Sequence, residues 1–176
     1  MLRKFYPDAY ASDVFSIDYQ KLYDMGYKAL LFDIDNTLVP HNRDITAEVE
    51  ELFKNLYAIG FKTVLVSNNS QARVEGFSKN IECPYVYEAG KPNITANIKA
   101  LNLLEISTKE SVFIGDQMFI DIYGANKAGL KSIMVHFIVV NDKEKIGVRR
   151  HLENFILFFY RMKKSAHKLN DAIIKR

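Results

Sequence analysis

Short apolar runs alternate with amphipathic segments over the first 140 residues of the chain. The runs are rich in branched and aromatic residues and are bounded by Gly, Pro, Asn or Asp, which is typical of buried strands. The segments between them repeat apolar residues at i, i+3, i+4 and i+7, which is typical of helices packed on a sheet. This alternation predicts an α/β fold with an open, doubly wound (Rossmann-like) parallel sheet. The five predicted strands cover residues 28–34, 62–67, 85–88, 111–115 and 131–137.

The predicted helices have recognisable start and stop signals. Thr46 is suited as the N-cap of the first helix, the acidic residues after it favour the positive end of the helix dipole, and Gly60 ends it. Pro92 can begin a later helix, and Gly129 suits the position just after another. Further helices are predicted over residues 72–79, 120–128 and 149–164.

Polar residues follow four of the predicted strands, at the point where each strand ends. The carboxyl ends of parallel strands meet at one edge of a sheet, so these side chains are expected to lie close together. In extended geometry Asp33 and Asp35 point the same way, and their charges repel unless a cation bridges them or one is protonated. The residues concerned are Asp33 and Asp35 after the first strand, Ser67 and Asn68 after the second, Lys91 after the third, and Asp116 with Asp121 after the fourth.

Each of these signals also has an ordinary structural explanation. Asp and Asn are common in turns, Ser and Asn cap helices, and a single Lys is usually a solvated surface residue. Their occurrence at the ends of four successive strands favours a common site. The carboxylates suit a hard, oxygen-ligated cation, and the hydroxyl and the lysine suit a phosphate, whereas the sequence offers no set of ligands typical of zinc.

Charge is distributed unevenly along the chain. The 176 residues carry 24 Lys+Arg against 21 Asp+Glu, a net charge of +3. Residues 141–176 hold 10 basic and 4 acidic residues, a net of +6, which leaves −3 for residues 1–140. A nucleic-acid binder usually carries its positive charge in the body of the fold, so nucleic acid is disfavoured as a partner. We therefore expect a phosphate-handling domain over residues 1–140 and a basic, amphipathic helical segment over residues 141–176.

Cysteine content and the lengths of the apolar runs exclude other classes of protein. Cys83 is the only cysteine, so neither a disulfide scaffold nor a cysteine-rich zinc site can form. No secretory signal is visible after Met1, and no apolar run approaches the roughly 20 residues needed to cross a bilayer. We expect a cytoplasmic protein, for which peripheral attachment to the inner face of the membrane stays open.

The polar strings at the strand ends resemble the four motifs of the haloacid dehalogenase-like (HAD) phosphatases. The strings are Asp33-Ile-Asp-Asn-Thr37, Ser67, Lys91-Pro92, and Gly115-Asp116 with Asp121. From Phe5 to about Val140 the chain is similar, more narrowly, to subfamily IIIA, typified by the bacterial YqeG-like proteins and the mitochondrial phosphatidylglycerophosphate phosphatases. This resemblance implies a HAD fold without a cap domain.

The resemblance implies a phosphomonoester hydrolase with an aspartyl-phosphate intermediate. Asp33 would be the nucleophile, and Asp35 the acid that protonates the leaving alcohol and then the base that activates water. Mg²⁺ would be held by the carboxylates of Asp33 and Asp116 and by the backbone carbonyl of Asp35, with Asp121 supporting the metal.

The other motif residues are implied to handle the phosphate. Ser67 and Lys91 would bind its remaining oxygens, and Asn68 would lie within reach of it. Thr37 would order the turn of the first motif. Ile120 stands where the family pattern has a hydroxyl residue, so a hydrogen bond from that position is lost.

Loop lengths bear on the substrate. Neither residues 38–45 nor the segment between Ser67 and Lys91 can house a lid domain. A site without a lid resembles those members of the superfamily that act on phosphates carried by a large substrate. Phosphatidylglycerophosphate is the best specific substrate by resemblance. The alternatives are a nucleic-acid end, a phosphoprotein or a sugar phosphate, or, from another class, an RNA- or protein-binding scaffold with a vestigial site. The intact motif residues argue against the scaffold.

The basic segment has two interpretations. Its helix, with apolar residues at helical spacing between Arg149 and Lys164, either packs on the sheet with solvated charges or docks on anionic lipid. The two coexist if one face packs and another stays open. The sequence leaves the oligomeric state undetermined.

Overall fold

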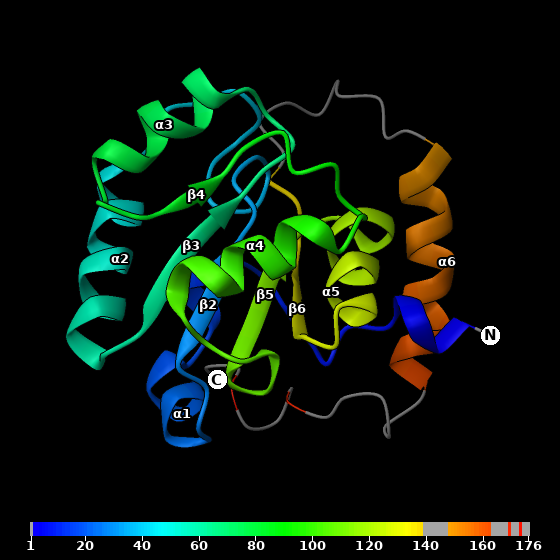
Figure 1. Ribbon diagram of the computed structural model, residues 1–176. Helices are drawn as coiled ribbons and strands as arrows, with labels where there is room; N and C mark the ends of the chain where they lie inside the picture. Colours follow the sequence, from blue (N-terminus) through cyan, green and yellow to red (C-terminus); the bar gives the residue numbers. More distant parts are fainter. Residues whose placement is uncertain (1, 139–147, 163–168, 170–172, 174–176) are drawn as a thin grey trace.

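The computed structural model describes residues 2–138, 148–162, 169 and 173. Its centre is a six-stranded, wholly parallel sheet in the order β1-β6-β5-β2-β3-β4. Helices lie on both faces of the sheet (Figure 1), which confirms the predicted doubly wound α/β fold. The strands are β1 (Ala9–Ala11), β2 (Ala29–Phe32), β3 (Lys62–Val66), β4 (Tyr85–Val86), β5 (Ser111–Gly115) and β6 (Lys131–Val135).

The central strand β2 is buried on both faces, which is why it reads as a continuous apolar run. Leu30 and Phe32 belong to the core on the side of α1 (Tyr19–Asp24), α2 (Ala47–Ile59) and α3 (Gln71–Lys79). Leu31 faces the opposite core, formed with α4 (Thr95–Leu104) and α5 (Tyr123–Lys127). In Figure 1 α4 and α5 cover the face of the sheet toward the viewer.

The signals for the ends of α2 are confirmed. The Thr46 hydroxyl accepts a hydrogen bond from the Val49 amide at 3.4 Å, and Gly60 adopts a φ of 108°, which glycine tolerates best. The start of α4 differs from the prediction, because the helix begins at Thr95 and not at Pro92. A turn closed by the Asn93 amide on the Gly90 carbonyl at 3.0 Å occupies the intervening residues.

A sixth strand, β1, was not predicted. It adds to the sheet edge beside β6, with Ala9 paired to Ile133. Asp8, just before it, accepts hydrogen bonds from the Lys131 ammonium group at 2.8 Å and the Ser132 amide at 3.1 Å, which anchors the strand. Three residues are too few to produce a recognisable alternation, so only the pairing reveals this strand.

The helix predicted over residues 120–128 is two elements. A π-helical turn, η4 (Met118–Ile122), leads directly into α5. The last helix, α6 (Val148–Met162), packs on η4 and β6 through a third apolar cluster that includes Met118, Met134 and Ile156. Three further short 3₁₀ turns are η1 (Leu2–Phe5), η2 (Val14–Ser16) and η3 (Thr108–Glu110).

The predicted boundary at residue 140 lies outside the described residues, as do Lys163 and Lys164 at the end of the predicted last helix. The division of the chain at that boundary therefore stays a prediction. Among the helices of the described residues, none is long and apolar enough to span a membrane.

Candidate active site

Three carboxylates meet at the carboxyl edge of the sheet. Asp33 follows β2 and Asp116 follows β5, and these strands are direct neighbours, so the Asp33 amide donates to the Ile114 carbonyl at 3.0 Å. Asp121 comes from η4, directly after β5. All three residues are buried, and one carboxylate oxygen from each lies within 4.8 Å of the others. Three buried acids this close need a cation or protons to offset their repulsion.

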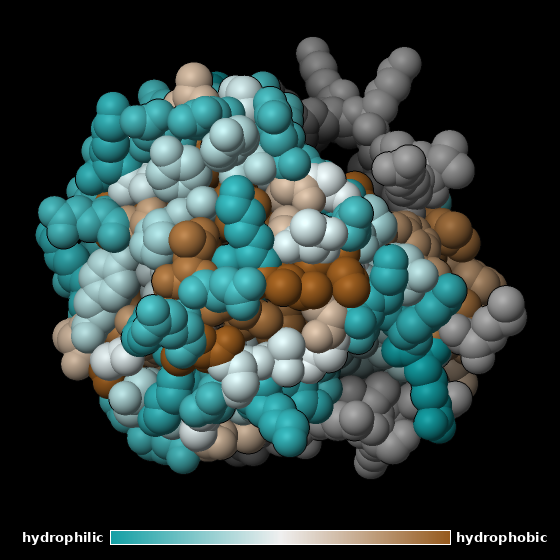
Figure 2. Space-filling view, in the orientation of Figure 1, coloured by the Kyte–Doolittle hydropathy of each residue, from teal (hydrophilic) through white to brown (hydrophobic). Residues whose placement is uncertain are grey.

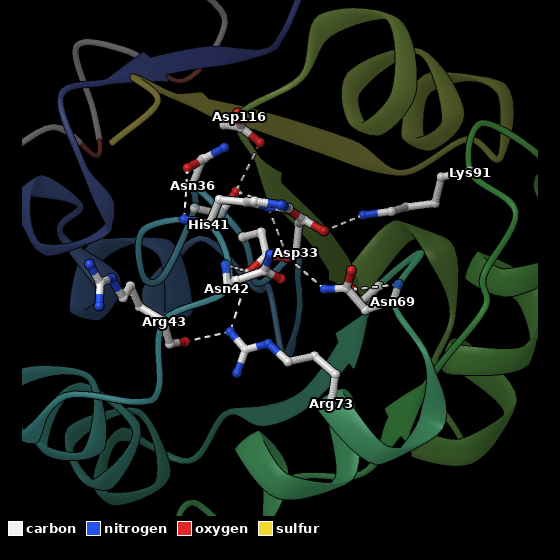
Figure 3. A network of polar contacts seen from close by, with 12 residues as sticks. Asp33, Asn36, His41, Asn42, Arg43, Asn69, Arg73, Lys91 and Asp116 are labelled. Atoms are coloured by element: carbon white, nitrogen blue, oxygen red, sulfur yellow. Dashed lines mark hydrogen bonds and ion pairs between the residues drawn. The ribbon is translucent and has the colours of Figure 1, made fainter. Parts of the chain in front are cut away.

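Lys91 supplies one cation to this acidic cluster. Its ammonium nitrogen lies 2.5 Å from Asp33 Oδ1 and 2.8 Å from Asp121 Oδ1 (Figure 3 shows the contact with Asp33). Burial lowers the pKa of Lys91, but the carboxylates of Asp121 and Asp33 outweigh this effect, so the pKa lies above its usual value and the lysine stays charged. Burial raises the pKa of the Asp33 carboxyl to about 6, against the lowering effect of Lys91.

The turn after β2 brings Thr37 back over the cluster. The Asn36 amide donates to the Val39 carbonyl at 2.7 Å, and Asn36 adopts a φ of 60°, which Asn tolerates better than most residues. The Thr37 hydroxyl then lies 3.4 Å from Asp33 Oδ2 and 3.5 Å from Asp116 Oδ1. Thr37 thus bridges Asp33 and Asp116, and its ordering role stays a prediction.

Asp121 is held in place by backbone and not by a neighbouring hydroxyl. Its Oδ2 accepts from the Gln117 amide at 3.0 Å, within the turn that η4 makes. A Cβ at Gly115 would lie 2.6 Å from the Asp121 Cβ, so only glycine leaves room for this side chain. Ile120, which replaces the expected hydroxyl residue, lines the adjoining pocket instead.

The turn after β3 supports Lys91. Asn68 Oδ1 accepts from the Lys91 amide at 2.9 Å, and the Ser67 hydroxyl accepts from the Asn69 amide at 3.2 Å. Ser67 and Asn68 both line the pocket in front of Asp33. The Asn68 amide group thus fixes the backbone that carries the lysine, and its predicted contact with phosphate stays a prediction.

Asp35 lies beside the acidic cluster, and its carboxylate is bound by a different set of groups. Oδ2 accepts from Asn69 Nδ2 at 2.6 Å, and Oδ1 accepts from the Asn42 amide at 3.1 Å. Arg73, on the first turns of α3, lies 3.3 Å from Oδ1, and His41 Nδ1 lies 3.4 Å from Oδ2. Figure 3 shows His41 and Asn42 on the loop after β2, together with Asn69 from the loop after β3 and Arg73 from α3.

Sequence reasoning missed the residues that hold Asp35. Arg73 also donates to the Arg43 carbonyl, so it ties α3 to the loop that follows β2. Asn69 and Arg73 stand four apart, a helical spacing that could have linked them to each other but not to Asp35. Contacts between different loops leave no local pattern in a sequence, which explains the omission.

These residues surround a pocket of about 120 Å³ at the carboxyl edge of the sheet. Asp33, Asp35, Ser67 and Lys91 all line it. The connections around it contain only loops, α3 and β4, so residues 38–45 and the segment between Ser67 and Lys91 form no lid domain, as predicted. The donors of the acidic cluster are all oxygens, which suits a hard divalent cation, and the lysine offers a positive charge to an anion.

Comparison with known proteins gives the family. Residues 88–137 match a family model described as HAD-hydrolase-like. The chain is 35% identical over 159 residues to the "Probable phosphatase YqeG" of Bacillus subtilis (strain 168), which covers 89% of this chain and 92% of that protein.

Solved structures agree on the fold. An uncharacterised protein from Listeria monocytogenes serotype 4b, 18% identical, aligns with a TM-score of 0.54 over 77% of this chain and 99% of that chain. A putative 3-deoxy-D-manno-octulosonate 8-phosphate phosphatase from Vibrio cholerae, 13% identical, aligns with a TM-score of 0.52 over 83% and 92%. With the fold, the four motifs and the extended identity in agreement, the chain belongs to the HAD superfamily and, within it, to the family of YqeG-like phosphatases.

Proposed function

We propose that this protein is a Mg²⁺-dependent phosphomonoester hydrolase that works through an aspartyl-phosphate intermediate. The observation that carries the proposal is the Asp33 carboxylate, which lies in the pocket between a buried ammonium group and two further buried carboxylates. A nucleophile so placed can meet a dianionic phosphate only if cations offset the charge on both. The site contains one such cation and the ligands for a second.

In the first step, Asp33 attacks the phosphorus in line with the ester oxygen. The new bond joins a carboxylate oxygen to phosphorus, the ester P–O bond breaks, and the alcohol leaves with a proton from Asp35. In the second step, Asp35 takes a proton from water, the resulting hydroxide attacks the phosphorus, and Asp33 is released with inorganic phosphate. Asp35 thus returns to its starting protonation state in each cycle.

The remaining groups stabilise the charge on the transferring phosphoryl group. Lys91 is already aligned with the nucleophile, and Ser67 lines the same pocket. Donors that are oriented before the reaction lower the barrier most, because no reorganisation is needed as charge develops.

The residues present fit a divalent metal ion. The carboxylates of Asp33 and Asp116 and the backbone carbonyl of Asp35 would hold it, and Asp121 would support it from η4. When bound, Mg²⁺ supplies electrostatic stabilisation to the nucleophile and the phosphoryl oxygens.

For the substrate, we propose phosphatidylglycerophosphate, presented at a membrane surface. The absence of a lid over residues 33–46 and 67–91 supports a substrate whose bulk stays outside the pocket. A lidless pocket of this size also admits other large phosphomonoesters, so a phosphoprotein and a nucleic-acid end belong in the same test.

The experiment is phosphate release from a panel of lipid, nucleotide, sugar and peptide phosphates, with and without Mg²⁺. Wild type should release phosphate only with the metal, and Asp33→Asn should abolish release. Asp24→Asn in α1, which removes an exposed carboxylate, is the matched control and should keep full activity. Selective turnover of the phospholipid supports the substrate proposal, whereas no metal-dependent turnover of any phosphomonoester would overturn the enzymatic one.

A further inference from the structure

The helix α6 has two apolar faces, of which only one is used in packing. Ile156, Leu157 and Tyr160 are buried against Met118 of η4 and Met134 of β6. The buried Glu153 adds a polar contact, because its carboxylate accepts from the Met118 amide at 3.0 Å. The helix is therefore anchored firmly by this inner face.

The opposite side of α6 exposes a row of large apolar side chains. Phe155, Phe158 and Met162 are 59%, 61% and 69% exposed, and the rings of Phe155 and Phe159 lie 5.0 Å apart. At 100° per residue these positions fall within about a third of the helix circumference, opposite the buried residues. Figure 2 shows hydrophobic side chains at the edge of the molecule where α6 lies. The outer face of α6 consists of Leu152, Phe155, Phe158, Phe159 and Met162.

Such a concentration of exposed apolar residues is unusual. Of the twelve large apolar side chains that are exposed among the described residues, five lie on this one helix. Scattered exposed apolar residues need no explanation, but a contiguous apolar face marks a binding surface. A helix with one packed face and a second, aromatic face open to solvent is suited to lie in the plane of a membrane interface.

The positive charge around α6 favours an anionic partner for its outer face. Residues 141–176, which contain α6, carry a net charge of +6, whereas the rest of the chain carries −3. Anionic lipid headgroups complement a basic segment, and the apolar outer face suits the acyl region directly beneath them. A second copy of the chain would bring two segments of the same positive charge together, so self-association through this face is opposed electrostatically.

We infer that the outer face of α6 is a docking surface for an anionic lipid bilayer. The inference deepens the proposed function. The usefulness of docking rests on that function, whereas lipid binding itself requires no catalysis. Through Glu153 and Met118 the helix is fixed to η4, which also carries Asp121. Docking therefore holds the catalytic pocket at a constant orientation to the membrane that presents the phosphate.

The test is co-sedimentation of the intact protein with vesicles of phosphatidylcholine alone or with a third of phosphatidylglycerol. Wild type should bind the anionic vesicles at least ten-fold more tightly than the neutral ones. The double variant Phe155→Ser with Phe159→Ser should lose at least ten-fold of that binding. Phe15→Ser in η2, an exposed phenylalanine outside α6, is the matched control and should bind like wild type.

Two further measurements separate the possible failures. Hydrolysis of a small soluble phosphomonoester should be equal in all three proteins, which reports on the catalytic site and the fold independently of lipid. The molar mass in solution should be that of one chain in the absence of vesicles. Failure of wild type to sediment with anionic vesicles, or equal binding by the double variant, would overturn the inference, as would a dimer that the double substitution dissociates.

Discussion

The carboxylate of Asp35 accepts a 2.6 Å hydrogen bond from the side-chain amide of Asn69. The two residues follow different strands, β2 and β3, and meet only because these strands are neighbours in the sheet. This contact holds the carboxylate of Asp35, which lines the same pocket as Lys91, whereas Lys91 itself meets Asp33 (Figure 3). The geometry separates Asp33, paired with a lysine, from Asp35, held by an amide and an arginine.

Replacing Asn69 by alanine should slow the hydrolysis of substrates that need a strong acid. An alkyl phosphate leaves poorly without a proton, whereas an aryl phosphate with an acidic phenol leaves readily. We expect kcat to fall about ten-fold for the alkyl ester and less than three-fold for the aryl ester, with KM little changed, since general acid catalysis contributes on the order of 10²–10⁴ in rate.

Asp35→Asn should show the same selectivity with a larger loss, and Asn55→Ala, an exposed asparagine in α2, should show none. An equal loss for both esters in Asn69→Ala would contradict a positioning role for Asn69.

Replacing Lys91 by methionine should destabilise the metal-free protein and stop catalysis. The substitution leaves the buried carboxylates of Asp33 and Asp121 without their ammonium partner. Breaking a buried ion pair in this way costs about 3–5 kcal/mol, and losing an oriented charge donor costs about 10²–10³ in kcat. Urea unfolding in a chelator measures the first effect, and phosphate release the second.

Saturating Mg²⁺ should raise the free energy of unfolding of Lys91→Met more than that of wild type, because the metal then supplies the missing cation. A variant as stable as wild type in the chelator would show that the ion pairs contribute nothing to the fold.

Gly115→Ala should displace Asp121. The new Cβ would lie 2.6 Å from the Asp121 Cβ, and this crowding is expected to cost about 1–3 kcal/mol in stability together with a weaker affinity for the metal. Gly76→Ala is the matched control, because Gly76 is exposed in α3 with no heavy atom within 4 Å of the added Cβ. That control should be about 0.5–1 kcal/mol more stable than wild type. Unaltered metal affinity in Gly115→Ala would contradict the role of Asp121.

The metal-free protein should lose stability as the pH rises through the pKa of Asp33. Burial raises this pKa from 3.8 to about 6, so between these values the folded protein holds a proton that the unfolded chain has lost. Stability therefore falls from about pH 4 to pH 6, and above pH 6 the ionised carboxyl costs on the order of 3 kcal/mol.

Asp33→Asn removes this titration, so in a chelator its stability should change less between pH 4 and pH 6 than that of wild type. Addition of Mg²⁺ should stabilise wild type and leave the variant nearly unchanged. An equal loss of stability between pH 4 and pH 6 in both proteins would contradict the burial effect on Asp33.

Much of the candidate site could be read from the sequence because of a general property of parallel sheets. Asp33, Lys91 and Asp116 each follow an apolar run, and a parallel sheet brings the ends of such runs to one edge whatever the details of the fold. Local signals also placed the ends of α2 at Thr46 and Gly60. The roles assigned to these site residues remain predictions, but their meeting at one edge is confirmed.

The features that the sequence concealed depend on contacts between distant segments. The strand β1 exists because Ala9 pairs with Ile133, and Asp35 is held because β2 and β3 are neighbours. Neither relationship leaves a periodic pattern along the chain.

The helix α6 shows most clearly which features the sequence determines and which features need the tertiary structure. Its amphipathic character and basic surroundings were determined by the sequence alone, because helical spacing and charge are local properties. Which of its apolar residues are buried was decided only by tertiary structure, since Ile156 packs on Met118 and leaves Phe155 on the outside. Hydrophobicity requires burial of some apolar surface, but only the shape of the surrounding fold determines which surface is covered and which is left for a partner.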